Sequence, residues 1–494
     1  MVSLLGSFFI TPIVLNTIGD KNYGFLSFCN SITTWLTLVS GALGASYVYF
    51  ATKESKADGT EGKTNNLFFR MLSITSVIVV VLAIAIVFLL KICGFQFSKY
   101  SKEENDLIFV LLAVSGINVG ANIFFSTFQL YNNYKKSFII VRGIAIFTSL
   151  LTYCGNLLIA TFYKSVILIA IFSIGITILQ GILNLFFAFK AGKMVFSKSS
   201  KEELLNDFRS IIKYSSIVLI GLVIENLDSN LDQTLLGAMV SAESVTMYHL
   251  SITFQSSLAI LAWAFIETLR PKIHELYRLE KDDEANELFL KICKFQSIVV
   301  LFIVGGFISC GYHLVTVWLG AKRIDVYYYS VALFVARIVP LTISASGEAY
   351  RAKNMHIIVT IFSIITIVVN LIISIALLLI LNARLAVWAC ILGTIIPMFL
   401  FSYIIVPIYD YHKLHLPIGR YYINLLKNLV MTLIAIIPSI ILSNFLNKTN
   451  MSFYVMFFLE GVLFVLIYVV ETLVFERKIV KNIISVYLKK ETQQ

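Results

Sequence analysis

The chain has 494 residues, of which 58% are hydrophobic and only 14% are charged, and its mean hydropathy is +0.86. Soluble domains usually carry about 25% charged residues, so this composition excludes a soluble fold and indicates an integral membrane protein. The net charge of +11 does not indicate a nucleic-acid partner, because the lysines and arginines lie in short loops between apolar segments, where they set orientation in the membrane.

Fourteen apolar segments are long enough to cross a bilayer, for which a helix needs about 20 residues. They predict an all-α polytopic membrane protein. In chain order, the predicted transmembrane segments cover residues 2–18, 25–50, 67–92, 107–131, 138–162, 165–189, 214–240, 245–269, 295–319, 328–350, 355–381, 386–409, 424–446 and 453–475.

Basic residues predict the orientation of these segments. If the chain starts inside the cell, 29 of the 39 lysines and arginines fall in cytoplasmic loops or the tail, and 9 fall in outer loops. By the positive-inside rule, we therefore expect both termini in the cytoplasm.

A weak internal repeat predicts two lobes. An Asn-Leu pair at Asn156 recurs at Asn370, and a glycine between two segments at Gly19 recurs at Gly237. Each repeat holds six segments, so the two lobes should share one orientation, as in transporters that rock about an interface between lobes. The expected domains are an N-terminal six-helix lobe at 1–189, a cytoplasmic amphipathic linker at 190–213, a C-terminal six-helix lobe at 214–409, and two extra transmembrane helices with a cytoplasmic tail at 410–494.

The seventh segment keeps three acids inside an apolar run: Glu225, Asp228 and Asp232. Their i, i+3, i+7 spacing places them on one stripe of a helix. An ionised carboxylate in hydrocarbon costs about 2.5–3.5 kcal/mol on insertion scales, so the stripe should face a bundle interior or a wet cavity. Three like charges on adjacent turns cannot all stay ionised cheaply. The stripe predicts coupling to a proton or a sodium ion; the alternative is a set of buried acids neutralised by basic neighbours.

Four further polar residues are candidates for substrate contact. Arg337 lies near the middle of the tenth segment, where it either pairs with Glu225 or binds an anion such as phosphate. Arg142 lies nearer the inner surface, where snorkelling to the interface is the favoured reading. Asn30 and Asn122 could line a cavity, but hydrogen bonds between helices explain them about as well.

Motifs for enzymes, metals and cofactors are missing from the sequence. The six cysteines form no CxxC pattern, the six histidines are scattered, and there is no GxxxxGK[ST] phosphate loop. We therefore expect no metal and no cofactor, and no ATPase activity within this chain. The outer loops are short, which argues against a membrane-embedded transferase or polymerase. A GxxxG pattern at Gly116 and Gly120 is more typical of packing within the chain than of dimerisation.

Short motifs near the start of each predicted lobe resemble those of a known family. They are Pro12, the run Ile18–Gly24, the Gly41–Gly44 end of the second segment, the run Asp232–Gly237, Tyr248, and Pro271 with Leu276-Tyr277. The chain resembles polysaccharide (O-antigen-type) lipid-linked oligosaccharide flippases of the multidrug/oligosaccharidyl-lipid/polysaccharide exporter superfamily.

The resemblance implies two six-helix bundles that form a V around a central cavity and alternate their access. It also implies transfer of undecaprenyl-pyrophosphate-linked oligosaccharide from the inner to the outer leaflet of the bacterial plasma membrane, for surface polysaccharides such as O antigen, capsule or exopolysaccharide. Asp232 falls on the family pattern, whereas Glu225 and Asp228 are extra acids. The short first segment departs from the family.

From this resemblance we expect a monomeric, non-enzymatic secondary transporter. Its partners would be the lipid-linked substrate, membrane lipid and a proton or sodium ion, with a polysaccharide polymerase and a chain-length regulator as candidate protein partners. Two other functions stay open. One is an ion-coupled multidrug/cation antiporter of the same superfamily, and the weaker one is a polysaccharide polymerase.

Overall fold

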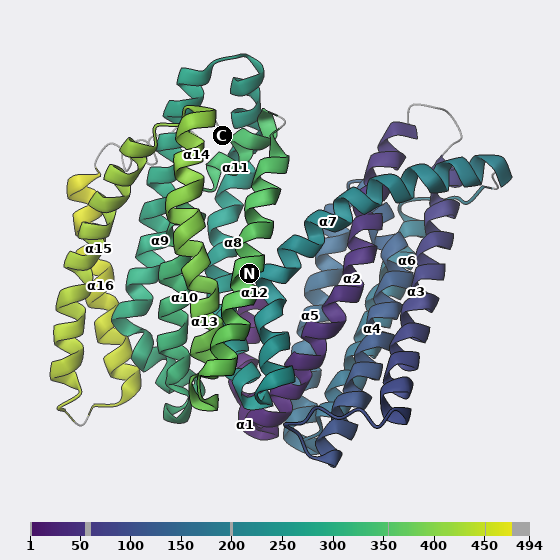
Figure 1. Cartoon of the computed structure of the whole chain (residues 1–494), viewed down its shortest axis with the longest axis horizontal. Helices are drawn as coiled ribbons and strands as arrows, with labels where there is room; N and C mark the ends of the chain where they lie inside the picture. Colours follow the sequence, from purple (N-terminus) through teal and green to yellow (C-terminus); the bar gives the residue numbers. More distant parts are fainter. Residues whose placement is uncertain (1, 55–60, 198–200, 354, 450, 477–494) are drawn as a thin grey trace. The chain divides into compact units, whose positions relative to one another are not determined.

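The computed structural model describes residues 2–54, 61–197, 201–353, 355–449 and 451–476, and this part of the chain is helical without any strand. The predicted all-α fold class is thus confirmed (Figure 1). The α-helices are α1 Val2–Ile18, α2 Asp20–Glu54, α3 Glu61–Ile92, α4 Lys102–Tyr134, α5 Phe138–Tyr163, α6 Val166–Lys190, α7 Lys201–Met239, α8 Ala242–Arg278, α9 Asp282–Leu319, α10 Asp325–Thr342, α11 Ala345–Ala352, α12 His356–Ile380, α13 Ala386–Leu400, α14 Val406–Leu414, α15 Ile418–Leu446 and α16 Phe453–Phe475.

Many of these helices can cross a membrane. Among the described residues, 11 spans are long and apolar enough, or 12 if the bent pair Ala242–Trp263 and Ile266–Arg278 within α8 counts as one span. The helix α1 has only 17 residues, and α7, which carries the acid stripe, is not among the spans that pass. The structure confirms a multi-pass membrane protein, but it does not confirm the predicted number of about fourteen spans.

The chain divides into two compact units. The N-terminal unit is Met1–Thr246 and the C-terminal unit is Met247–Gln494, so α7 belongs to the first unit and the division falls within α8. The helix α7 is unbroken over 39 residues. The part of the predicted linker from residue 201 to 213 therefore continues directly into the predicted seventh span. The lobe boundary expected from the repeat stays a prediction, and the cytoplasmic tail beyond residue 476 lies outside the described residues.

Local sequence signals explain where several helices begin and end. Ser101 caps α4 in a capping box: its hydroxyl accepts from the backbone N–H of Glu104, and the Glu104 carboxylate accepts from the backbone N–H of Ser101 at 2.9 Å. Gly320 ends α9 with a φ of 86°, a conformation that side chains disfavour.

Close packing in the N-terminal unit confirms the reading of the GxxxG pattern. A Cβ at Gly120 would lie 2.2 Å from Val80 Cγ2, and one at Gly116 would lie 2.4 Å from the Cβ of Ala83. The hydroxyl of Ser76 donates to the Gly120 carbonyl at 2.7 Å, because the missing side chain lets the backbones of α3 and α4 approach. The pattern packs two helices of one chain together.

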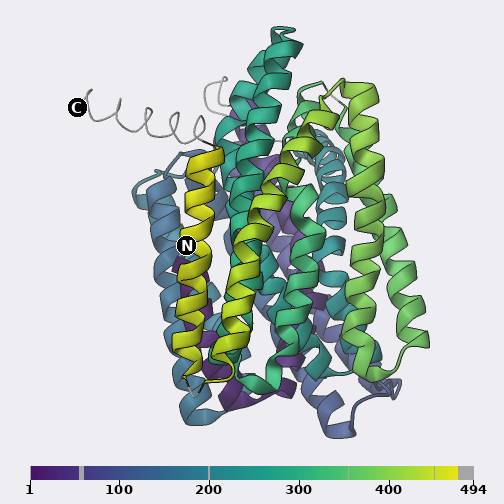
Figure 2. The same cartoon turned by 90° about the vertical axis from the view of Figure 1, so that its left-hand side faces the viewer.

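In the C-terminal unit, α15 and α16 run side by side and both pack against α9 (Figure 2). Polar contacts fix them along the length of α9. Asn428 of α15 donates to the Ser297 hydroxyl at 2.6 Å, and the Tyr468 hydroxyl of α16 donates to the Ile298 carbonyl at 2.8 Å. Aromatic rings add apolar contact, as between Phe302 and Tyr468 with centroids 5.3 Å apart.

Two predicted single spans are interrupted close to a proline. The segment at 328–350 consists of α10 and α11, with the break just after Pro340, and α13 and α14 are joined by a short π-helical segment that follows Pro397. Proline lacks an N–H group and its ring clashes with the turn before it, whereas both irregular segments follow the proline, so the prolines lie near these points without accounting for them. Arg337 lies within one turn of Pro340.

Candidate functional site

The acid stripe lies on the long helix α7 of the N-terminal unit. Its backbone is helical throughout, so Glu225, Asp228 and Asp232 share one stripe as predicted. The side chain of Asp232 is 3% exposed, and its neighbour Gln233 is also buried. The side chains of Glu225 and Asp228 lie outside the described residues, so their orientation stays a prediction.

Hydroxyl pairs hold α7 against α2. The hydroxyls of Ser31 and Thr234 lie 3.1 Å apart near one end, and those of Ser46 and Ser215 lie 2.6 Å apart near the other. In a low-dielectric interior such pairs satisfy groups that would otherwise be costly to bury. The contacts place the acid-bearing helix firmly beside α2.

A ladder of amides and hydroxyls runs beside the acid stripe on α7. Asn226 donates to the Leu222 carbonyl at 3.1 Å, Asn230 donates to Asn226 Oδ1 at 3.3 Å, and Thr234 donates to the Asn230 carbonyl at 3.0 Å. The ladder residues recur every four positions, so they follow one face of the helix. Sequence reasoning missed this ladder, although its four-residue spacing was the available signal. The helix α7 thus carries two adjacent polar stripes.

The predicted substrate contacts fall in both units. Asn30 on α2 is exposed and its Oδ1 accepts from the Ser115 hydroxyl of α4 at 3.4 Å, while Asn122 on α4 and Arg142 on α5 are exposed in the same N-terminal unit. Arg337 is half-buried on α10 in the C-terminal unit. The two arginines therefore belong to different units, and a pairing of Arg337 with Glu225 stays a prediction.

A buried polar cluster links α12 and α13 in the C-terminal unit. Asn370 donates to the Thr394 hydroxyl at 3.1 Å, and Ser374 donates to Asn370 Oδ1 at 2.9 Å. A Cβ at Gly393 would lie 1.9 Å from Ser374 Oγ, so the two helices are in close contact there. The repeat marker Asn370 therefore has a packing role, since it joins two helices through hydrogen bonds.

The C-terminal unit also gathers three basic residues around one buried acid. Glu348 on α11 has a side chain that is only 5% exposed, and its oxygens lie 3.1 Å from Arg270 Nε, 3.2 Å from His274 Nε2 and 2.7 Å from an Arg351 guanidinium nitrogen. Arg270 and His274 lie one turn apart on α8. The two arginines exceed the single carboxylate in charge, so this Glu348 cluster can attract an anion.

This Glu348 cluster was not predicted, because Arg270 and Glu348 are far apart in the sequence and each reads as an ordinary loop-proximal charge. By the predicted orientation, the ends of α8 and α11 both face the cytoplasm. The cytoplasmic placement of the cluster stays a prediction that rests on this orientation.

A family model matches the whole N-terminal half of the chain and continues beyond it. The model described as "Polysaccharide biosynthesis protein" matches residues 1–276, more than half of the 494 residues. The chain therefore belongs to this polysaccharide biosynthesis family, and the family resemblance seen in the sequence motifs is confirmed. No curated protein matches the chain significantly in sequence.

Solved structures share the fold. The chain is similar to the lipid II flippase MurJ in an inward closed conformation, with a TM-score of 0.74, 14% identity, and coverage of 97% of this chain and 98% of that one. It is also similar to an inward-facing multidrug resistance MATE family transporter of the MOP superfamily, with a TM-score of 0.60, 13% identity, and coverage of 83% and 96%. At these identities the likeness shows the fold alone, which is that of flippases and transporters.

Proposed function

We propose that this protein moves undecaprenyl-pyrophosphate-linked oligosaccharides from the inner to the outer leaflet of the bacterial plasma membrane. The observation that carries the proposal is membership of the polysaccharide biosynthesis family in a chain whose fold matches a lipid flippase over almost its whole length. Both termini lie in the cytoplasm, as the distribution of basic residues predicts. The protein performs no covalent chemistry and needs no cofactor.

The physical problem is to carry a polar headgroup through about 30 Å of hydrocarbon. The lipid tail stays in the bilayer, so the protein needs to shield only the sugar and the pyrophosphate. The polar stripes of α7 supply hydrogen-bonding groups along such a route. Alternating access exposes this route to one side at a time.

Different polar side chains bind the substrate and the coupling ion. Arg337 binds the pyrophosphate, because a guanidinium donates in parallel to phosphate oxygens. Arg142, Asn30 and Asn122 are further candidates for substrate contact in the N-terminal unit, where amides suit sugar hydroxyls. The stripe Glu225, Asp228 and Asp232 takes up a proton or sodium ion.

The Glu348 cluster receives the anionic headgroup at the cytoplasmic side, which its excess of basic groups supports. A polysaccharide polymerase and a chain-length regulator are the protein partners that would consume the product.

An ion-coupled multidrug/cation antiporter is the second candidate. The fold similarity to a MATE family transporter favours it, and buried acids would suit a cationic substrate. The excess of basic residues around Glu348 argues the other way, because it would repel cations at the side where they enter. A polysaccharide polymerase is a weaker third candidate, since the outer loops are short.

Removing the protein from its cell should leave the lipid-linked oligosaccharide on the cytoplasmic leaflet. The measurement is binding of a membrane-impermeant lectin to right-side-out and inverted membrane vesicles. We expect the sugar to become accessible only in inverted vesicles, and restoring the gene should restore access from outside. Unchanged outer-leaflet sugar after removal would contradict the proposal, provided that no second flippase is made.

A further inference from the structure

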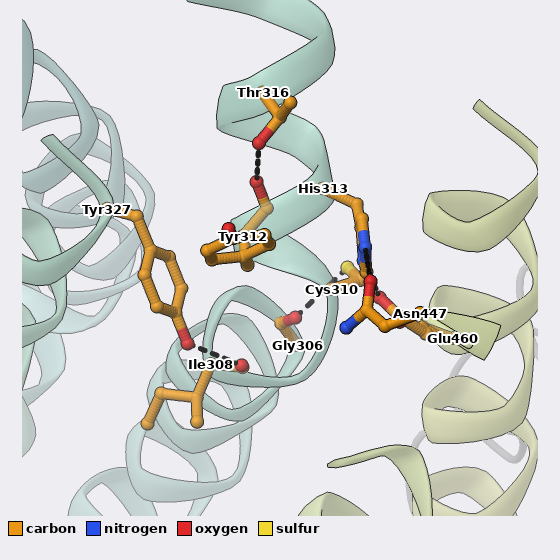
Figure 3. Close-up of polar contacts among 9 residues, drawn as sticks. All are labelled: Gly306, Ile308, Cys310, Tyr312, His313, Thr316, Tyr327, Asn447 and Glu460. Atoms are coloured by element: carbon orange, nitrogen blue, oxygen red, sulfur yellow. Dashed lines mark hydrogen bonds and ion pairs between the residues drawn. The ribbon is translucent and has the colours of Figure 1, made fainter. Parts of the chain in front are cut away.

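Three polar side chains from three helices of the C-terminal unit meet at one end of α9 (Figure 3). His313 Nδ1 lies 2.9 Å from Glu460 Oε2 on α16, and His313 Nε2 lies 3.1 Å from the Oδ1 of Asn447, which caps the end of α15. The side chains of His313 and Glu460 are 0% exposed, whereas Asn447 and the Lys448 that follows it are exposed. Asn447 therefore connects the buried His313–Glu460 pair to the surface of the unit.

Among the described contacts of the pair, no Lys, Arg or second acid forms an ion pair with His313 or Glu460. The Phe453 ring stacks on the His313 ring with centroids 5.9 Å apart. The titratable groups with described contacts next to the pair are Cys310 and Tyr312 of α9 and Tyr327 of α10, whose hydroxyl donates to a backbone carbonyl. The charged groups near this end of α9 have other described positions: Arg323 donates to the Leu319 carbonyl, and Lys322 and Lys448 are exposed. Asp325 and Tyr328 of α10 and Tyr454 of α16 are the remaining titratable groups of the adjoining helix ends. Thiols and phenols are neutral near pH 7. Any charge on the glutamate must therefore be balanced within the pair itself.

Hydrogen-bond geometry fixes how many protons the pair holds. His313 Nε2 faces an amide oxygen, so Nε2 carries a hydrogen. The short contact between Nδ1 and Oε2 then needs one more hydrogen, held by either the imidazole or the carboxyl group. In the described part of the chain, Glu460 Oε1 is buried and has no hydrogen-bond partner, which further disfavours a bare carboxylate. Either arrangement is neutral overall, as burial requires.

We propose that His313, Glu460 and Asn447 form a proton-binding site that fastens α15 and α16 to α9. Loss of the shared proton would leave a buried carboxylate facing a nitrogen lone pair, with no cation to balance it. The helix pair α15 and α16 lies outside the predicted six-helix repeat, so this site is separate from the acid stripe on α7. By the predicted orientation it lies toward the outer face, where it senses the pH outside the cell.

The test is the pH dependence of thermal unfolding in purified protein, compared with Glu460→Gln. Above about pH 7.5, free histidine is neutral and free glutamate is ionised, whereas the folded pair holds one proton more than these two groups together. The folded-to-unfolded ratio of the wild type should therefore fall by up to about tenfold per pH unit, until the folded pair itself loses the proton. In Glu460→Gln the amide donates to neutral Nδ1, so this slope should vanish, and Glu287→Gln at an exposed site should keep it.

Parallel curves for wild type and Glu460→Gln between about pH 7.5 and 9, where free histidine is neutral, would overturn the proton assignment. If Glu460→Gln does not fold, the double variant His313→Gln/Glu460→Gln gives the reference, because two amides can pair without a titratable group.

A disulfide tests the fastening separately. A Cβ at Gly461 would lie 3.7 Å from Cys310 Sγ, so Gly461→Cys can be oxidised to lock α16 onto α9. The effective concentration of the two thiols, measured as the fraction of disulfide formed in a fixed redox buffer, reports how often α16 lies against α9. Relative to Glu460→Gln, whose contact holds no titrating proton, this value should fall in the otherwise wild-type chain as the pH rises and the pair loses its proton. A ratio that does not change with pH would overturn the fastening.

Discussion

Replacing Asp232 or Asp228 by Asn should abolish the stimulation of transport by an imposed ion gradient. Asp232 is buried on α7, and Asp228 lies one turn earlier on the same stripe. A gradient can drive transport only if the ion binds one conformational state more tightly than the other, and a carboxylate supplies that difference through its charge. The coupling free energy between ion binding and substrate binding is typically about 1–3 kcal/mol. Its loss should lower the stimulation of transport by the gradient by about 5- to 150-fold.

The measurement is headgroup transfer by reconstituted protein, with and without imposed pH and sodium gradients. Asp106→Asn is the matched control, because Asp106 is half-exposed on α4 and pairs with Lys91 outside the stripe. Whether the proton or the sodium gradient loses its effect identifies the coupling ion. Stimulation that persists in both Asp228→Asn and Asp232→Asn would remove these acids from the coupling mechanism.

The second large effect should come from Arg337→Lys, which keeps the charge but loses the planar fork of donors. A guanidinium makes two parallel hydrogen bonds to phosphate oxygens, whereas an ammonium binds as a point charge. Loss of one charge-assisted hydrogen bond costs about 1.5–3 kcal/mol, so transport should fall by about 10- to 150-fold. Arg384→Lys, in the exposed turn Ala383–Leu385, should leave transport unchanged.

A structural role for Arg337 gives a different result. If Arg337 only neutralises Glu225, then Arg337→Ala should regain transport when Glu225→Gln is added, since both charges then disappear together. If Arg337 binds pyrophosphate, the double variant should stay inactive.

The fold was largely predictable because lipid imposes a simple rule. Each backbone group must be satisfied within a helix, so apolar length alone marks most helices. It was harder to predict where one helix ends and the next begins. The sequence analysis separated an amphipathic linker at 190–213 from a seventh span at 214–240, yet α7 runs from Lys201 to Met239 without a break. The prolines gave no clear signal for the breaks that follow Pro340 and Pro397, because a proline disturbs the turn before it and can kink a transmembrane helix without ending it.

The candidate site was predictable only where single residues were conspicuous. A buried Asp232 follows from the cost of charge in hydrocarbon, and the structure confirms its burial. Contacts between distant segments left no such signal. Glu348 and Arg270, like His313 and Glu460, come from different helices, and each looks ordinary until folding brings the helices together.

The most direct measurement is transfer of a lipid-linked oligosaccharide between leaflets of liposomes that contain only the purified protein. We expect the sugar headgroup to cross at a rate that depends on the protein and responds to an ion gradient, while a cationic dye stays inside. A headgroup distribution that never changes under any gradient, together with export of the dye, would contradict the flippase and establish the antiporter.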